Sequence, residues 1–137
     1  MRKSLFITSF IFLLISCSKT KLENPFPFLL SSYGNEYSVV ASIETDTLLS
    51  VYYPLFEKYG YVGNGVCWEG HIIQILEKED VGLLDEIEFD PEAGAFHARF
   101  DSEDSQLRFV NVLSPIFSNL ERLEKYVKAA DPKRIDD

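Results

Sequence analysis

The sequence contains only two cysteines and two histidines, and this scarcity excludes several kinds of site. If Cys17 is modified, a single cysteine remains, Cys67, which excludes a disulfide framework. A zinc site needs several closely spaced cysteine, histidine or acidic ligands, and no such set is present. Nucleophilic catalysis needs a base beside a serine or cysteine, and neither His71 nor His97 lies in a motif of that kind. We therefore expect no metal, no cofactor and no enzymatic activity.

The sequence has fewer basic than acidic residues, and it has no apolar segment long enough to span a membrane. The 137-residue chain has 13 Lys and Arg residues against 22 Asp and Glu residues, which gives a formal net charge of −9. An acidic protein repels nucleic acids and anionic lipid surfaces, so we expect no nucleic-acid partner and a basic protein partner, if any. The apolar segment 5–15 is about half as long as the roughly 20 residues that a membrane-spanning helix needs.

The N-terminus has the pattern of a bacterial lipoprotein signal. Two basic residues precede the apolar segment, which is followed by Ser16 and Cys17. A basic start, a short apolar segment and a small residue at the cleavage site are typical of secretory signals. A cysteine at the next position is the residue that accepts a lipid. We therefore expect residues 1–16 to be removed, which changes the formal side-chain charge from −9 to −11, and Cys17 to carry the lipid.

This interpretation places the protein in the bacterial cell envelope, on the periplasmic face of a membrane. Residues 17–27 would form the lipidated cysteine and a polar tether. Ser18 stands where an aspartate would favour retention in the inner membrane, so the outer membrane is favoured. The alternatives are a transmembrane anchor and an ordinary secreted protein that is cleaved near Ser18.

A single domain is expected over residues 28–130, with a polar, frayed tail over residues 131–137. Two hairpins are predicted in it, over residues 28–43 and 86–100, because β-forming residues flank turn-forming ones in both segments. In the second hairpin apolar and charged residues alternate, which indicates a sheet that is covered on one face only. Its turn contains Pro91 and Gly94, and we expect a positive φ at Gly94.

Four helices are predicted from apolar residues at helical spacing. The first is a short helix that has Pro54 in its first turn and Gly60 at its end. The second starts at Asn64, the third starts at Ser102 and is ended or kinked by Pro115, and the last follows a further cap residue. The predicted fold class is α+β, a largely antiparallel sheet of two hairpins with about four helices packed on one face.

The glycine-rich segment 60–65 invites comparison with a phosphate-binding loop. The dinucleotide fingerprint, however, has different spacing and follows a strand, whereas a helix precedes this segment. We interpret its glycines as a turn between two helices, with Asn64 capping the second helix.

Two blocks of the sequence resemble the immunity protein 51 family of bacterial polymorphic toxin loci. Residues 59–68 read YGYVGNGVCW, and residues 87–96 read IEFDPEAGAF. The family characteristically carries a Gly-Tyr-x-Gly-Asn-Gly-x-x-Trp block followed by a Phe-Asp-Pro-Glu-Ala-Gly-x-Phe block. The resemblance covers about residues 37–128. The chain departs from the family at Cys67, where a small polar residue is expected, and in its lipoprotein signal, since many relatives look cytoplasmic.

The resemblance implies an immunity protein, or antitoxin, that binds a cognate toxin and neutralises it by occlusion without catalytic residues. Together with the signal, it implies that the toxin is intercepted in the periplasm or at a membrane. We expect the motif residues to be mainly structural: Gly60, Gly63, Asn64, Gly65, Trp68, Pro91 and Gly94. Toxin contacts are expected on an acidic hairpin face with a tyrosine nearby: Glu86, Glu88, Asp90, Glu92 and Tyr61.

Two other functions stay open at this point. One is an envelope lipoprotein with a structural or scaffolding role that is unrelated to toxins. The other is a small hydrolase that uses a pair of carboxylates. An immunity gene should follow a large toxin gene, so the neighbouring gene separates the first alternative from an immunity function.

Overall fold

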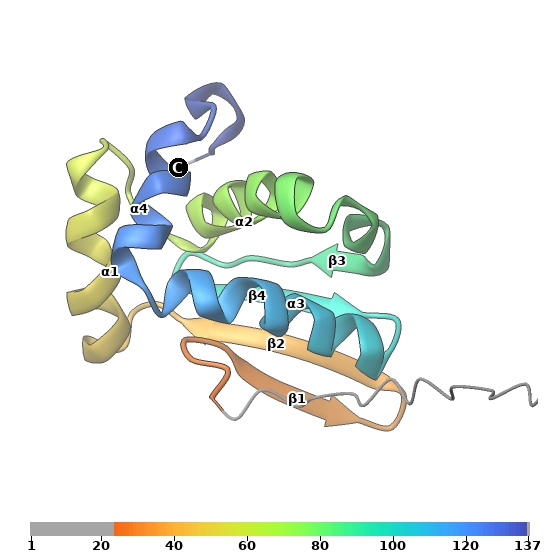
Figure 1. The fold of residues 1–137 in the computed structure, drawn as a ribbon. Helices are drawn as coiled ribbons and strands as arrows, with labels where there is room; N and C mark the ends of the chain where they lie inside the picture. The colour runs from red at the N-terminus through yellow and green to blue at the C-terminus, as the bar shows by residue number, and fades with distance from the viewer. Residues whose placement is uncertain (1–23, 137) are drawn as a thin grey trace, which may run out of the picture.

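The computed structural model describes residues 24–136, so Cys17, the expected signal peptide and most of the expected tether lie outside the described residues. Four strands form one antiparallel sheet in the order β1-β2-β4-β3, with the helices packed on one face (Figure 1). The strands are β1 (Leu29–Tyr33), β2 (Glu36–Ser42), β3 (Ile87–Phe89) and β4 (Ala95–Phe100). The α-helices are α1 (Asp46–Lys58), α2 (Gly65–Glu79), α3 (Glu103–Phe117) and α4 (Leu120–Ala129). Two short 3₁₀ helices are η1 (Val81–Glu86) and η2 (Pro132–Arg134). The predicted α+β fold is confirmed.

Both predicted hairpins form, and they pair with each other through β2 and β4. A two-residue turn connects β1 to β2, and Gly34 takes a φ of 60° in it, which a glycine adopts without steric cost. On β4 the buried residues Phe96, Ala98 and Phe100 alternate with half-exposed ones, as the sequence predicts. The sheet therefore has one face against the helices and one open face.

Helix α1 differs from the prediction, because Pro54 lies in its interior rather than in its first turn. The helix begins at the cap residue Thr45, whose side chain accepts a hydrogen bond from the Leu48 N–H. Proline has no N–H to donate to the carbonyl four residues earlier, that of Ser50. Both Pro54 and Ser50 are exposed, so water can satisfy that carbonyl, and the helix continues to Lys58.

Helix α3 also runs past a proline. Ser102 caps it as predicted, and the Ser102 and Ser105 side chains form a reciprocal capping box. Pro115 does not end the helix, which continues to Phe117. The carbonyl that loses its donor belongs to the exposed Asn111, the same arrangement as in α1.

The core is a cluster of aromatic side chains between the sheet and the helices. Trp68 is completely buried, and its ring lies 4.9 Å from the ring of Tyr52 and 5.0 Å from that of Phe117. The Tyr52 hydroxyl donates a hydrogen bond of 2.9 Å to the Phe117 carbonyl oxygen, which joins α1 to the end of α3. Burial raises the pKa of the Tyr52 phenol, so this donor stays protonated.

Two predicted boundaries are wrong, because both ends of the described chain pack onto helices. The Ser114 hydroxyl donates to the Pro25 carbonyl at 2.8 Å, so residues 25–27 belong to the domain rather than to a tether. At the other end, the expected frayed tail docks on α2. The Gln74 side chain bonds both the N–H and the carbonyl of Asp131, and Ile135 is buried beside α2. Within residues 24–136, no helix is both long enough and apolar enough to cross a bilayer.

Candidate functional site

The two motif blocks, far apart in sequence, meet in one tight junction. Gly65, the first residue of α2, lies against the backbone of the β3–β4 turn. A Cβ atom on Gly65 would stand 2.0 Å from the carbonyl oxygen of Glu92 and 2.2 Å from that of Ala95. The Gly65 N–H also donates to the Ala93 carbonyl at 3.3 Å. Only glycine permits this approach, so the predicted structural role of Gly65 has a direct physical cause.

The glycines before this junction shape the end of α1 and the start of α2. Gly60 has a φ of 84°, and the N–H groups of Gly60 and Tyr61 donate to the carbonyls of Glu57 and Phe56. This pattern is a Schellman motif, which ends the helix as predicted. Gly63 has a φ of 74°, and the Asn64 side chain accepts from the Cys67 N–H at 2.8 Å. The predicted cap at Asn64 is confirmed.

Gly94 serves a different purpose from the predicted one. Its φ is not positive, since the positive-φ glycines of the described chain are Gly34, Gly60 and Gly63. A Cβ atom on Gly94 would instead lie 2.6 Å from the carboxyl carbon of Glu44. The Gly94 carbonyl oxygen accepts hydrogen bonds from the N–H groups of Ile43, at 2.9 Å, and Glu44, at 3.3 Å. The turn after Pro91 therefore docks on the segment that follows β2 through the Gly94 carbonyl, and the flexible Glu44 side chain is the group that a Cβ atom would displace.

Two of the four predicted acidic contact residues lie together on the open face of the sheet. Arg99 on β4 forms an ion pair with Glu88 on β3 at 3.4 Å and another with Asp90, and His97 Nδ1 lies 3.7 Å from the Asp90 carboxylate. Arg99 lowers the pKa of Asp90, chiefly by donating a hydrogen bond, and the neighbouring His97 adds to this effect.

Glu36 at the start of β2 adds a further carboxylate to this group, because it lines the same surface hollow as Glu88 and Arg99. Like Asp90 and Glu88, it raises the pKa of Arg99, though least of the three. We call the group Glu36, Glu88, Asp90 and Arg99 the open-face cluster. It contains three carboxylates and one guanidinium, so the face keeps a negative charge. Sequence reasoning missed Glu36 as a member, because only the pairing of β2 with β4 brings it beside the second hairpin.

Glu86, the third predicted contact residue, is not part of this face. It lies at the end of η1, where its carboxylate accepts from Arg108 of α3 at 2.8 Å. Arg108 also pairs with Asp80 at 2.9 Å. The three side chains connect the α2–β3 segment to α3, on the helical side of the sheet. The alternating sequence pattern predicts that Glu86 lies on the same face as Glu88. In the structure Glu86 ends the 3₁₀ helix η1, and β3 begins only at Ile87, so the alternation does not extend to Glu86.

The other two predicted contact residues, Glu92 and Tyr61, lie on different parts of the molecule. Glu92 is exposed in the β3–β4 turn, where its backbone bonds Ala95. The Tyr61 ring packs edge-on against the buried His71 of α2, with 4.7 Å between ring centroids. The structure therefore places Tyr61 in the helical layer rather than beside the open face.

Comparisons of the chain with family models, with curated proteins and with solved structures gave no match. The resemblance to the immunity family thus rests on the two motif blocks themselves. Among residues 24–136, no group of three or more His, Cys, Asp or Glu side chains is arranged to hold a metal ion.

Proposed function

We propose that this protein is an immunity protein that binds a toxin and neutralises it by occlusion. The observation that carries the proposal is the junction between the two motif blocks. Gly65 of the first block and the turn of the second block touch through backbone atoms, so the residues behind the resemblance act as one structural unit. A motif that specifies a scaffold is what a binding protein without catalytic residues needs, because the scaffold then presents exposed side chains such as Glu88 and Asp90 to a partner.

The open-face cluster is the surface that suits such a partner. Its three carboxylates lie on a sheet face that no helix of residues 24–136 covers. The Glu88 and Asp90 side chains are 74% and 52% exposed although both pair with Arg99, so a partner can reach their carboxylates. A basic toxin surface would be attracted to this face, and the attraction would speed docking and weaken with salt.

The place of action follows from the expected lipid on Cys17. An anchored immunity protein would meet its toxin in the periplasm or at the membrane surface, before the toxin reaches its target.

The decisive experiment is co-expression with the toxin that the neighbouring gene encodes. We expect cells to survive with the full chain, and to die when residues 1–16 are deleted or when Cys17→Ser prevents lipidation. A purified mixture should contain a one-to-one complex by light scattering. Death in the presence of the exported protein, with no complex formed, would contradict the proposal.

A second experiment locates the binding surface. The double substitution Glu36→Lys with Glu88→Lys reverses charge on the open face, whereas Glu57→Lys with Glu121→Lys makes the same change on exposed helix positions. We expect the first pair alone to slow association and to flatten its salt dependence. Equal rates for both variants would exclude the open-face cluster from the interface.

A further inference from the structure

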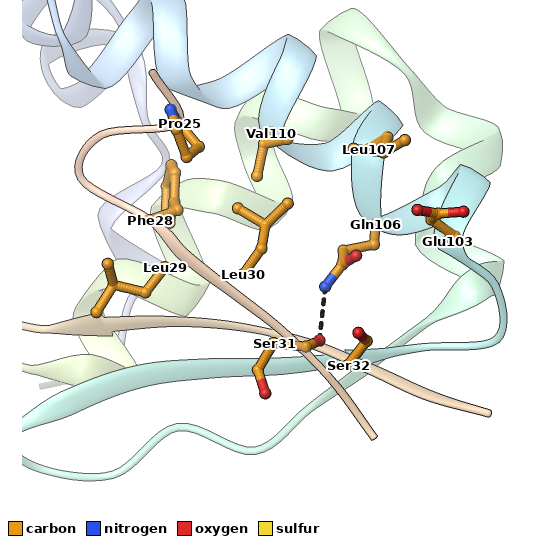
Figure 2. Close-up of a pocket in the computed structure, with 10 residues that line it drawn as sticks. All are labelled: Pro25, Phe28, Leu29, Leu30, Ser31, Ser32, Glu103, Gln106, Leu107 and Val110. Atoms are coloured by element: carbon orange, nitrogen blue, oxygen red, sulfur yellow. Dashed lines mark hydrogen bonds between the residues drawn. The ribbon is translucent and has the colours of Figure 1, made fainter. Parts of the chain in front are cut away.

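A groove of about 370 Å³ lies between β1 and α3, away from the open-face cluster (Figure 2). Leu30 points into it from the strand, and Leu107 and Val110 face it from the helix. Ser32 and Glu103 line one end, and Pro25 and Phe28 line the other. The groove therefore combines an apolar floor with one acidic end.

The strand beside this groove is an edge of the sheet. Among the described residues, β1 pairs with β2 only, so peptide groups along its other side have no strand partner. Natural edge strands are protected by charges, prolines, bulges or short length, yet β1 has five uncharged residues, LLSSY, and regular pairing. The opposite edge strand, β3, has only three residues and contains Glu88. The β1 edge is thus the one suited to pairing with another chain.

The walls of the groove are fixed in place before any partner binds. The Gln106 amide, almost fully buried, donates to the Ser31 carbonyl at 2.9 Å and to the Ser38 carbonyl at 2.7 Å, which joins α3 to both β1 and β2. The Ser114 hydroxyl holds Pro25 at the far end. A preformed groove lowers the entropic cost of ordering a bound segment.

We propose that this groove binds an extended segment of the toxin, which adds to β1 as a fifth strand. This inference rests on the proposed function. Backbone hydrogen bonds along an edge strand give affinity in such complexes, and pockets for alternate side chains give specificity. The lining selects an apolar side chain over Leu107 and Val110 and a lysine or arginine beside Glu103. A basic residue at that end matches the charge of a toxin that is drawn to an acidic protein.

Hydrogen exchange on the full chain, with and without the toxin of the neighbouring gene, tests the inference directly. We expect amides of β1 that face the free edge to exchange at least about tenfold more slowly in the complex, because they gain strand partners. Amides along the free edge of β3 should gain less protection, because the open-face cluster meets a partner through side chains rather than through this edge. Protection of β3 without protection of β1 would overturn the inference.

A charge reversal with a matched control gives an independent measurement. Glu103 and Glu121 are exposed acidic residues in the first turns of α3 and α4, so their substitution disturbs the two helix dipoles alike. Glu103→Lys should weaken toxin binding about three- to tenfold by calorimetry, and Glu121→Lys should leave it unchanged.

The outcomes separate this inference from the proposed function. If a toxin complex forms but β1 stays unprotected and Glu103→Lys binds at full strength, the groove inference fails and the immunity function stands. If no complex forms, both fail. If the β1 amides are already protected in the full chain without toxin, another part of the chain or a second copy occupies the edge, and the inference is overturned.

Discussion

The hairpin β3–β4 is attached to the helices along its length, whereas the hairpin β1–β2 leaves its outer strand exposed. The β3–β4 turn touches Gly65 at the start of α2, and the segment before β3 is joined to α3 through Arg108. The hairpin β1–β2 is joined to the rest of the sheet through the pairing of β2 with β4, and Gln106 of α3 bonds both of its strands. Tyr33, at the end of β1, is 86% exposed.

This difference suggests a division of roles within one sheet. The attached hairpin carries a motif block, and its special residues are explained by close backbone contacts. The exposed hairpin has no motif residue, yet it offers an unprotected strand and a groove. The attached hairpin then combines scaffold residues with most of the charged side chains of the open-face cluster, whereas the exposed hairpin offers its strand edge.

Of the substitutions that test this difference between the hairpins, Gly65→Ala should lower the free energy of unfolding most. Alanine normally stabilises a helix by up to about 1 kcal/mol relative to glycine. In Gly65→Ala the new methyl group would overlap two backbone carbonyls, so we expect the free energy of unfolding to fall by about 3 kcal/mol or more. Gly82→Ala is the control, because nothing lies within 4 Å of its Cβ position. Urea unfolding measures both, and equal stabilities would mean that the junction is not tight.

Much of the fold could be predicted because its signals are local. The turn at Gly34 and the caps at Asn64 and Ser102 are specified by residues within a few positions of them. The alternation along β4 likewise identified its buried face from sequence. Each of these features depends on one segment of the chain and on the intrinsic preference of its residues.

The errors share a different cause, since each depends on contacts between distant segments. Pro54 remains within α1 because buried side chains such as Tyr52 hold that helix against the core. Ile135 folds onto α2 although its neighbours are polar. The expected acidic face likewise lost Glu86 to Arg108, which lies 22 residues later in sequence. No local pattern encodes such pairings, so the candidate site was predicted less well than the fold.

Arg108→Gln should weaken the attached hairpin to a moderate degree. The substitution removes the guanidinium between Asp80 and Glu86 and leaves two carboxylates close together. Because the Arg108 side chain is 37% exposed, solvent screening reduces the effect, and we expect a loss of about 1 kcal/mol in unfolding free energy. The loss should shrink in high salt. Thermal unfolding at two salt concentrations measures it, and a salt-independent loss would contradict the ion-pair explanation.

Tyr33→Ser on the exposed hairpin should change stability very little. The side chain is 86% exposed, so its removal should alter the unfolding free energy by less than about 0.5 kcal/mol. If β1 serves a partner, the same variant should bind the toxin more weakly. Urea unfolding and calorimetry separate the two effects, and a large stability loss with normal toxin binding would reverse the roles given to the two hairpins.

The smallest expected effect concerns the pKa of Asp90. Arg99 lowers this pKa, mainly through a direct hydrogen bond, so Arg99→Gln should raise it towards the ordinary aspartate value of about 3.9. A carboxylate with a lowered folded-state pKa stabilises the fold above its unfolded-state pKa, and this stabilisation is lost as the pH falls through the folded-state value. The stability difference between wild type and Arg99→Gln should therefore be constant above about pH 5 and shrink below about pH 4. Arg134→Gln is the control, because Arg134 lowers the pKa of Glu77 instead. Carbon-detected NMR titration should find Asp90 shifted only in the first variant and Glu77 only in the second, and a shift of Asp90 in both would mean that overall charge, rather than the Arg99 contact, sets its pKa.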